Sequence, residues 1–117
     1  MASEIALPVV LAEGNDVLVF RSLSDLCNWV EAVDVDSGGF HVWDASGRVL
    51  LLSTDPPHGL ATTRPVHVSL AVNAAPGSSD LALLLTTRLR SAGIPANTNE
   101  PVGLLIDRFV IWQGYSR

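Results

Sequence analysis

The sequence contains no lysine, and its seven basic residues are all arginine. Charged residues make up only 16% of the 117-residue chain, whose net charge is −5. Nucleic-acid binding depends on clustered lysine and arginine side chains, which neutralise phosphates. The shortage of positive charge therefore argues against nucleic acid, and the acidic balance suits either a basic protein partner or solubility alone.

Long hydrophobic runs and cysteine pairs are also missing. The apolar stretches at residues 7–12 and 49–52 fall well short of the ~20 residues that cross a bilayer. Residues 1–4 lack the basic start and apolar segment of a signal peptide. The lone cysteine, Cys27, has no partner for an internal disulfide, which fits a reducing compartment. We therefore expect a cytoplasmic protein that does not enter a membrane.

Apolar residues, by contrast, are plentiful. They account for 48% of the chain, which is enough for a core and argues against disorder. The length is typical of one domain, so we expect a single α+β domain over residues 1–117.

The first third of the chain predicts a hairpin and a helix. Apolar runs at residues 5–11 and 17–20 flank a cluster of turn formers. Pro8 cannot donate to a strand ladder, which predicts that the first strand lies at a sheet edge. Ser22 is a predicted helix cap, and apolar residues then recur at helical spacing. Cys27 lies on that apolar stripe and is predicted to be buried.

The rest of the chain predicts strands and a second helix. Residues 40–44 and 48–53 form a hairpin around the turn sequence Asp-Ala-Ser-Gly, and residues 66–72 alternate as a half-buried strand does. A helix follows that ends at Gly93, and its leucine stripe is predicted to pack over the inward side of the strand at residues 66–72. The residues of that stripe are Leu81, Leu84, Leu85 and Leu89. Residues 102–112 are rich in β-branched and aromatic side chains, which favours a last strand, with a short helix as the alternative.

The predicted order is therefore β-β-α-β-β-β-α-β. Strands joined by tight turns pair antiparallel, and two amphipathic helices can cover one face of such a sheet. We predict a two-layer α+β sandwich with a mostly antiparallel sheet and both helices on one face.

Catalytic signatures are absent from the sequence. It has no glycine-rich phosphate loop, no Gly-x-Ser-x-Gly elbow, no Cys-x-x-Cys pair and no His-Glu-x-x-His helix. The spacing of His41, His58 and His67 matches no compact metal motif. We therefore expect no enzyme activity, no metal and no cofactor. The alternative is a small-ligand or enzyme-like pocket near His41, His67 and Asp44.

A cluster of carboxylates predicts a binding surface. Glu31, Asp34 and Asp36 lie at the end of the first predicted helix and in the loop after it, where negative charge opposes the helix dipole. Carboxylates at this place lower the stability of the helix slightly. Either a surface for a basic partner or a solvated loop explains why they are there. Asp44 in the adjacent turn adds a carboxylate, and Trp43 adds an aromatic anchor of the kind enriched at binding hot spots. A homodimer built on the N-terminal hairpin is a further alternative.

One stretch also suggests a family. Residues 29–35, followed by Gly39-Phe40, Val42, Asp44 and residues 47–50, are similar to small uncharacterised proteins of high-GC bacteria. Some of those proteins resemble immunity proteins encoded beside polymorphic toxins. The resemblance covers about twenty residues of the first half. It implies a cytoplasmic inhibitor that occludes the active site of a toxin with acidic and aromatic side chains.

Overall fold

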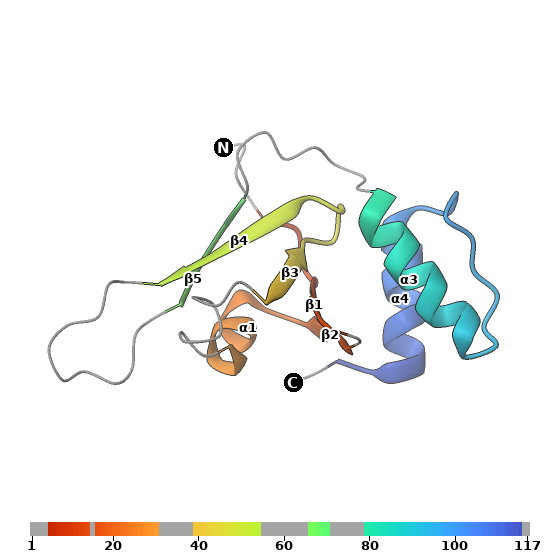
Figure 1. Ribbon diagram of the computed structural model, residues 1–117, viewed down its shortest axis with the longest axis horizontal. Helices are drawn as coiled ribbons and strands as arrows, with labels where there is room; N and C mark the ends of the chain where they lie inside the picture. The colour runs from red at the N-terminus through yellow and green to blue at the C-terminus, as the bar shows by residue number, and fades with distance from the viewer. Residues whose placement is uncertain (1–4, 15, 31–38, 55–65, 71–78, 116–117) are drawn as a thin grey trace, which may run out of the picture.

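The computed structural model describes residues 5–14, 16–30, 39–54, 66–70 and 79–115. These residues form an antiparallel five-stranded sheet, in the order β2-β1-β3-β4-β5, and three helices (Figure 1). The strands are β1 (Val9–Glu13), β2 (Asp16–Phe20), β3 (Phe40–Trp43), β4 (Val49–Thr54) and β5 (Val66–Leu70). The helices are α1 (Leu23–Trp29), α3 (Ser79–Ser91) and α4 (Val102–Gln113). The predicted α+β class is confirmed.

The first strand is not the edge strand that Pro8 predicts. β1 pairs antiparallel with both β2 and β3, so it is internal to the sheet. Pro8 lies just before the first residue of β1, so its missing N–H does not interrupt the ladder. The edge of the N-terminal hairpin, on which the homodimer alternative depends, belongs to β2.

The predicted last strand is a helix. In α4 the buried residues are Leu105, Ile106 and Phe109, while Leu104 and Ile111 are exposed. Burial therefore recurs at helical spacing, and packing of this face overrides the strand preference of the β-branched residues. The observed order is β-β-α-β-β-β-α-α.

Helices cover both faces of the sheet, and not one face as predicted. On one face the core joins α3 and α4 to the strand residues Val10, Ala12, Val19 and Trp43. On the other face it joins Leu26 of α1 and Val30 to Val9, Leu11, Phe20, Val42 and Leu50. Successive side chains of a strand point to opposite faces, so the unbroken apolar run of β1 supplies both cores. Figure 1 shows α1 on the side of the sheet away from α3 and α4.

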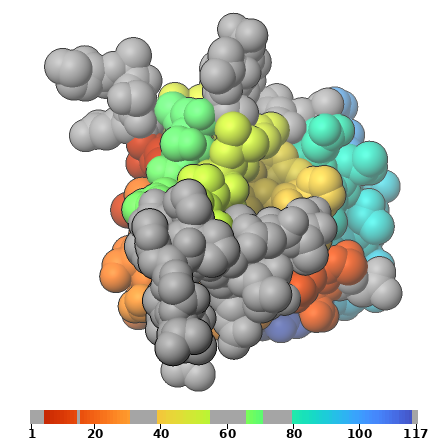
Figure 2. Space-filling view, turned by 60° about the vertical axis from the view of Figure 1, so that its left-hand side comes forward, coloured from red at the N-terminus to blue at the C-terminus, as the bar shows by residue number. Residues whose placement is uncertain are grey.

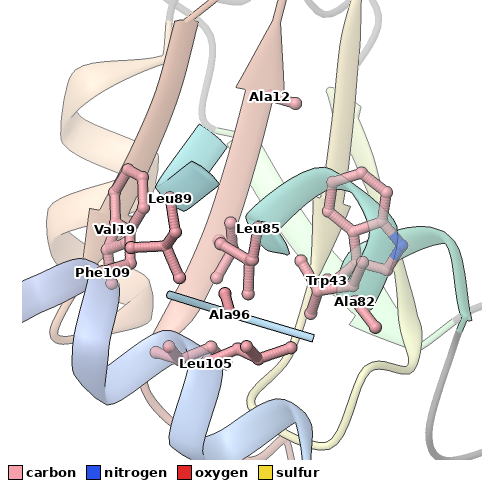
Figure 3. Packing of buried hydrophobic residues seen from close by; sticks show 12 residues of the cluster. Ala12, Val19, Trp43, Ala82, Leu85, Leu89, Ala96, Leu105 and Phe109 are labelled. Atoms are coloured by element: carbon pink, nitrogen blue, oxygen red, sulfur yellow. The ribbon is translucent and has the colours of Figure 1, made fainter. Parts of the chain in front are cut away.

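The leucine stripe of α3 is buried as predicted. Leu81, Leu85 and Leu89 have no exposed surface, and Leu84 is half-buried against the same core. Figure 3 shows Leu85 and Leu89 gathered with Leu105 and Phe109 of α4. The predicted partner of this stripe is wrong, however. Val66, Val68 and Leu70 of β5 pack against the core on the α1 side of the sheet. Side chains of β5 alternate between the two faces, and these three point away from α3.

Candidate functional site

Three of the five predicted site residues, Glu31, Asp34 and Asp36, lie outside the described residues. Trp43 is described, and only 9% of it is exposed. It packs in the core beneath α3 and α4, and its ring stacks on that of His41 with 6.3 Å between centroids. Trp43 is thus a core residue and not the exposed anchor that the sequence predicts, because the helices cover this part of its strand face.

Asp44 is buried as well, with no exposed side-chain surface. Its carboxylate accepts backbone hydrogen bonds from Ala6, Ser46 and Arg48 and two side-chain bonds from Arg48. Burial alone raises the pKa of this carboxyl, but the hydrogen bonds outweigh burial and hold the pKa below its ordinary value. The carboxylate is therefore engaged inside the protein and does not face a partner.

These contacts explain the turn between β3 and β4. The Gly47 N–H donates to the Asp44 carbonyl at 3.0 Å, and Gly47 has a φ of +86°. Glycine adopts this left-handed conformation without the strain of a Cβ. The predicted turn is confirmed, and the role of Asp44 is to organise it.

The structure does not bring Asp44 together with His41 and His67, as the alternative pocket requires. Ser53 pairs with His67, and Trp43 pairs with Val49, which places both histidines on the same sheet face. They lie on β3 and β5, with β4 between them. The carboxylate of Asp44 is enclosed by its own turn, so it does not join them.

The structure brings together a different set of side chains, which we call the open face. It comprises His41, Val49, Leu51, Ser53, His67 and Ser69, all exposed and all on the sheet face that α3 and α4 cover elsewhere. The two helices pack over β1, β2 and Trp43 but leave this half of the face uncovered. In Figure 2, β5 (green), β4 (yellow-green) and β3 (gold) lie side by side next to α3 (teal).

The open face is apolar at its centre and carries no carboxylate or guanidinium. Val49 is 42% exposed and Leu51 is 49% exposed, two positions apart on β4. Polar hydroxyl and imidazole groups of Ser53, His67 and Ser69 surround them. Depletion of charged residues around an apolar centre is typical of the core of a protein interface.

Sequence reasoning missed the open face, although a signal was present. Residues 49–52 form an unbroken apolar run, whereas a strand with one solvated face alternates between apolar and polar. Leu50 is buried on the α1 side, so Val49 and Leu51 must be apolar for another reason. A run of this kind predicts a strand that has an apolar contact on each side.

Comparisons with protein-family models, with curated proteins and with solved structures find no match to this chain. Within the described segments, no group of three or more His, Cys, Asp or Glu side chains could hold a metal ion. No helix in these segments is both long enough and apolar enough to cross a membrane.

Proposed function

We propose that this chain is a non-catalytic protein-binding domain that docks a partner protein on the open face. The exposure of Val49 and Leu51 is the observation that carries this proposal. Full burial of a Val or Leu side chain is worth about 1.5–3 kcal/mol, so covering these half-exposed residues contributes about 1 kcal/mol each. Apolar patches beside packed cores mark interaction sites in many proteins.

The charge of the chain indicates a basic partner. The net charge is −5, while the open face itself has neither carboxylates nor guanidinium groups. A partner with an apolar centre and a basic rim fits this combination, because the negative field speeds association while the uncharged centre avoids desolvating ions. Glu31, Asp34 and Asp36 belong to the proposal as part of that negative field.

The concrete form that we propose is an immunity protein. It acts in the cytoplasm and neutralises a cognate bacterial toxin by covering the toxin's active site. The acidic balance of the chain and the resemblance of residues 29–50 support this form. Docking through a preformed sheet face suits an inhibitor, because little ordering entropy is lost on binding.

The test is a pair of matched substitutions. Leu51→Asp introduces a charge at the centre of the open face, and Leu83→Asp introduces the same charge on α3, where Leu83 is 59% exposed. The product of the adjacent gene is purified, and its affinity for each variant is measured by isothermal titration calorimetry.

We expect Leu51→Asp to weaken binding by tenfold or more, since a buried unpaired charge costs well over the ~1.4 kcal/mol that corresponds to tenfold. Leu83→Asp should leave the affinity unchanged. Equal affinities for both variants, with melting curves that show both folded, would remove the open face from the proposal.

A further inference from the structure

Helix α4 carries an exposed row of side chains on the side that faces away from the core. Leu105 and Phe109 point from α4 into the core with α3 and the sheet (Figure 3). Residues three, four and seven apart share one face of a helix, so Leu104, Asp107 and Ile111 form a row on the opposite side. Leu104 is 51% exposed and Ile111 is 86% exposed. The row therefore presents two apolar side chains to solvent, with a carboxylate between them.

A hollow adjoins this row at the first turn of α4. Its volume is about 410 Å³, and it lies between that turn, the residues that precede β1 and the turn between β3 and β4. Its described lining is apolar apart from Asp107, and it includes the exposed side chains of Leu7 and Leu104. Hollows of this size with apolar walls and few polar groups are typical of binding sites.

Gly103 lines the hollow, although the fold does not require a glycine there. Its backbone is not in the left-handed region, and an added Cβ would meet no heavy atom within 4 Å. Glycine also lowers the stability of a helix relative to other residues. A glycine that neither the backbone nor the internal packing needs is consistent with the close approach of another molecule to this turn.

Asp107 gives the row a negative charge that no described residue neutralises. It is the only charged residue in the described lining of the hollow, and its carboxylate makes no hydrogen bond or ion pair with a described residue. The neighbouring Arg108 pairs instead with Glu100 at 2.6 Å. A carboxylate between two apolar side chains is complementary to a basic residue flanked by apolar ones. It disfavours a second copy of this chain, because a two-fold axis through the row would bring two Asp107 carboxylates together.

We propose that the outer face of α4 binds a helical segment of a partner protein. The segment places one apolar side chain in the hollow beside Gly103, pairs a lysine or arginine with Asp107 and packs a second apolar side chain on Ile111. These contacts follow one another at about one helical turn along α4, which is the spacing of side chains on one face of a partner helix. The site shares no residue with the open face and stands independently of the function proposed above.

The probe is a set of blocked alanine–glutamine peptides of about 15 residues, stapled on one side so that they stay helical. Each carries a central lysine and, at varied positions, a leucine three or four residues to either side of it. A matched set has norleucine in place of lysine, which keeps the apolar stem and removes the charge. NMR titration of the isotope-labelled full chain gives the dissociation constants, at low ionic strength so that charge pairing is little screened.

We expect at least one lysine peptide to shift the methyl resonances of Leu104 and Ile111. Its norleucine counterpart should bind about threefold more weakly or worse, as the loss of an exposed ion pair predicts. Asp107→Asn should abolish that preference. Asp25→Asn is the matched control and should keep the preference, because it removes the same charge from α1, on the other side of the sheet.

A second variant tests the hollow itself. Gly103→Leu should fill the hollow and weaken binding of the lysine peptide by about tenfold, while the free energy of unfolding stays the same or rises, because leucine favours a helix more than glycine does. Leu51→Asp should leave peptide binding intact, so failure here is distinguishable from failure of the open face.

Several results would overturn the proposal. One is the absence of binding below millimolar concentration for every lysine peptide. Another is a lysine preference that survives Asp107→Asn, and a third is a folded Gly103→Leu variant that binds the peptide as tightly as the wild type. A dimer of the free chain that Ile111→Asp dissociates, measured by analytical ultracentrifugation, would assign this face to a second copy instead.

Discussion

The guanidinium group of Arg48 donates two hydrogen bonds to one carboxylate oxygen of Asp44, from Nε at 2.9 Å and from Nη2 at 2.7 Å. The other oxygen accepts the backbone N–H groups of Ser46 and Arg48 at 3.0 Å. The first oxygen also receives the Ala6 N–H at 3.1 Å, which ties the N-terminal segment to the turn. This carboxylate therefore fixes the hairpin that carries Val49 and Leu51 on the open face.

Asp44→Asn should destabilise the fold by about 3 kcal/mol at neutral pH, since it removes the charge from a buried ion pair. Urea unfolding of the wild type and the variant measures the loss. Asp44→Glu keeps the charge but displaces the carboxylate, so it should recover less than half of the lost free energy of unfolding. A loss below about 1 kcal/mol would show that the five hydrogen bonds to this carboxylate are dispensable.

The same pair should make stability depend on pH. The pKa of Asp44 is below its ordinary value of 3.8 in the folded state, so the unfolded chain binds its proton first as the pH falls. The stability due to Asp44 is complete above that ordinary value and is lost as the pH falls through the folded pKa. The difference in unfolding free energy between wild type and Asp44→Asn should therefore shrink from pH 7 to pH 2.5. A difference that stays constant over this range would contradict the lowered pKa of Asp44 in the folded state.

Leu85→Ala should cost about 2–5 kcal/mol, the usual range for truncating a fully buried leucine. Leu85 has no exposed surface and packs between α3 and the sheet. Leu83→Ala is the control, because Leu83 is 59% exposed and surface truncations usually change stability by less than about 0.5 kcal/mol. Chemical denaturation of both variants checks the expectation. Similar losses would mean that α3 presents a different face to the core.

Cys27 should react slowly with thiol reagents in the native protein and rapidly after denaturation. The side chain is half-buried, and burial raises the pKa of its thiol, which lowers the thiolate fraction at neutral pH. A spectrophotometric thiol assay in buffer and in urea measures both rates. Equal rates would place the thiol outside the packed side of α1.

Local signals in the sequence predict local structure well. The Ser22 cap is confirmed, since its hydroxyl accepts the Asp25 N–H at 3.1 Å, and the turn from Asp44 to Gly47 forms as expected. Both features depend on side chains within a few residues of each other. The leucine stripe of α3 is equally local, and its burial follows from its spacing alone.

Features that depend on distant packing could not be predicted in the same way. Residues 102–112 have strand-like composition, and only their contacts with α3 and the sheet favour the helix. Trp43 and Leu51 share a sheet face, yet one is covered by helices and the other is exposed. The strand pattern predicts which face a residue points to, but not how far the helices extend across that face.

Hydrogen–deuterium exchange of the complex with its protein partner tests the central claim most directly. Docking on the open face should slow exchange of the backbone amides of β4 and β5, at residues 49–54 and 66–70. The reason is that a bound partner restricts local opening of these two strands. Amides on the outer side of α3, around Leu83, should exchange as in the free protein. Slowed exchange at α3 with β4 and β5 unchanged would contradict the account.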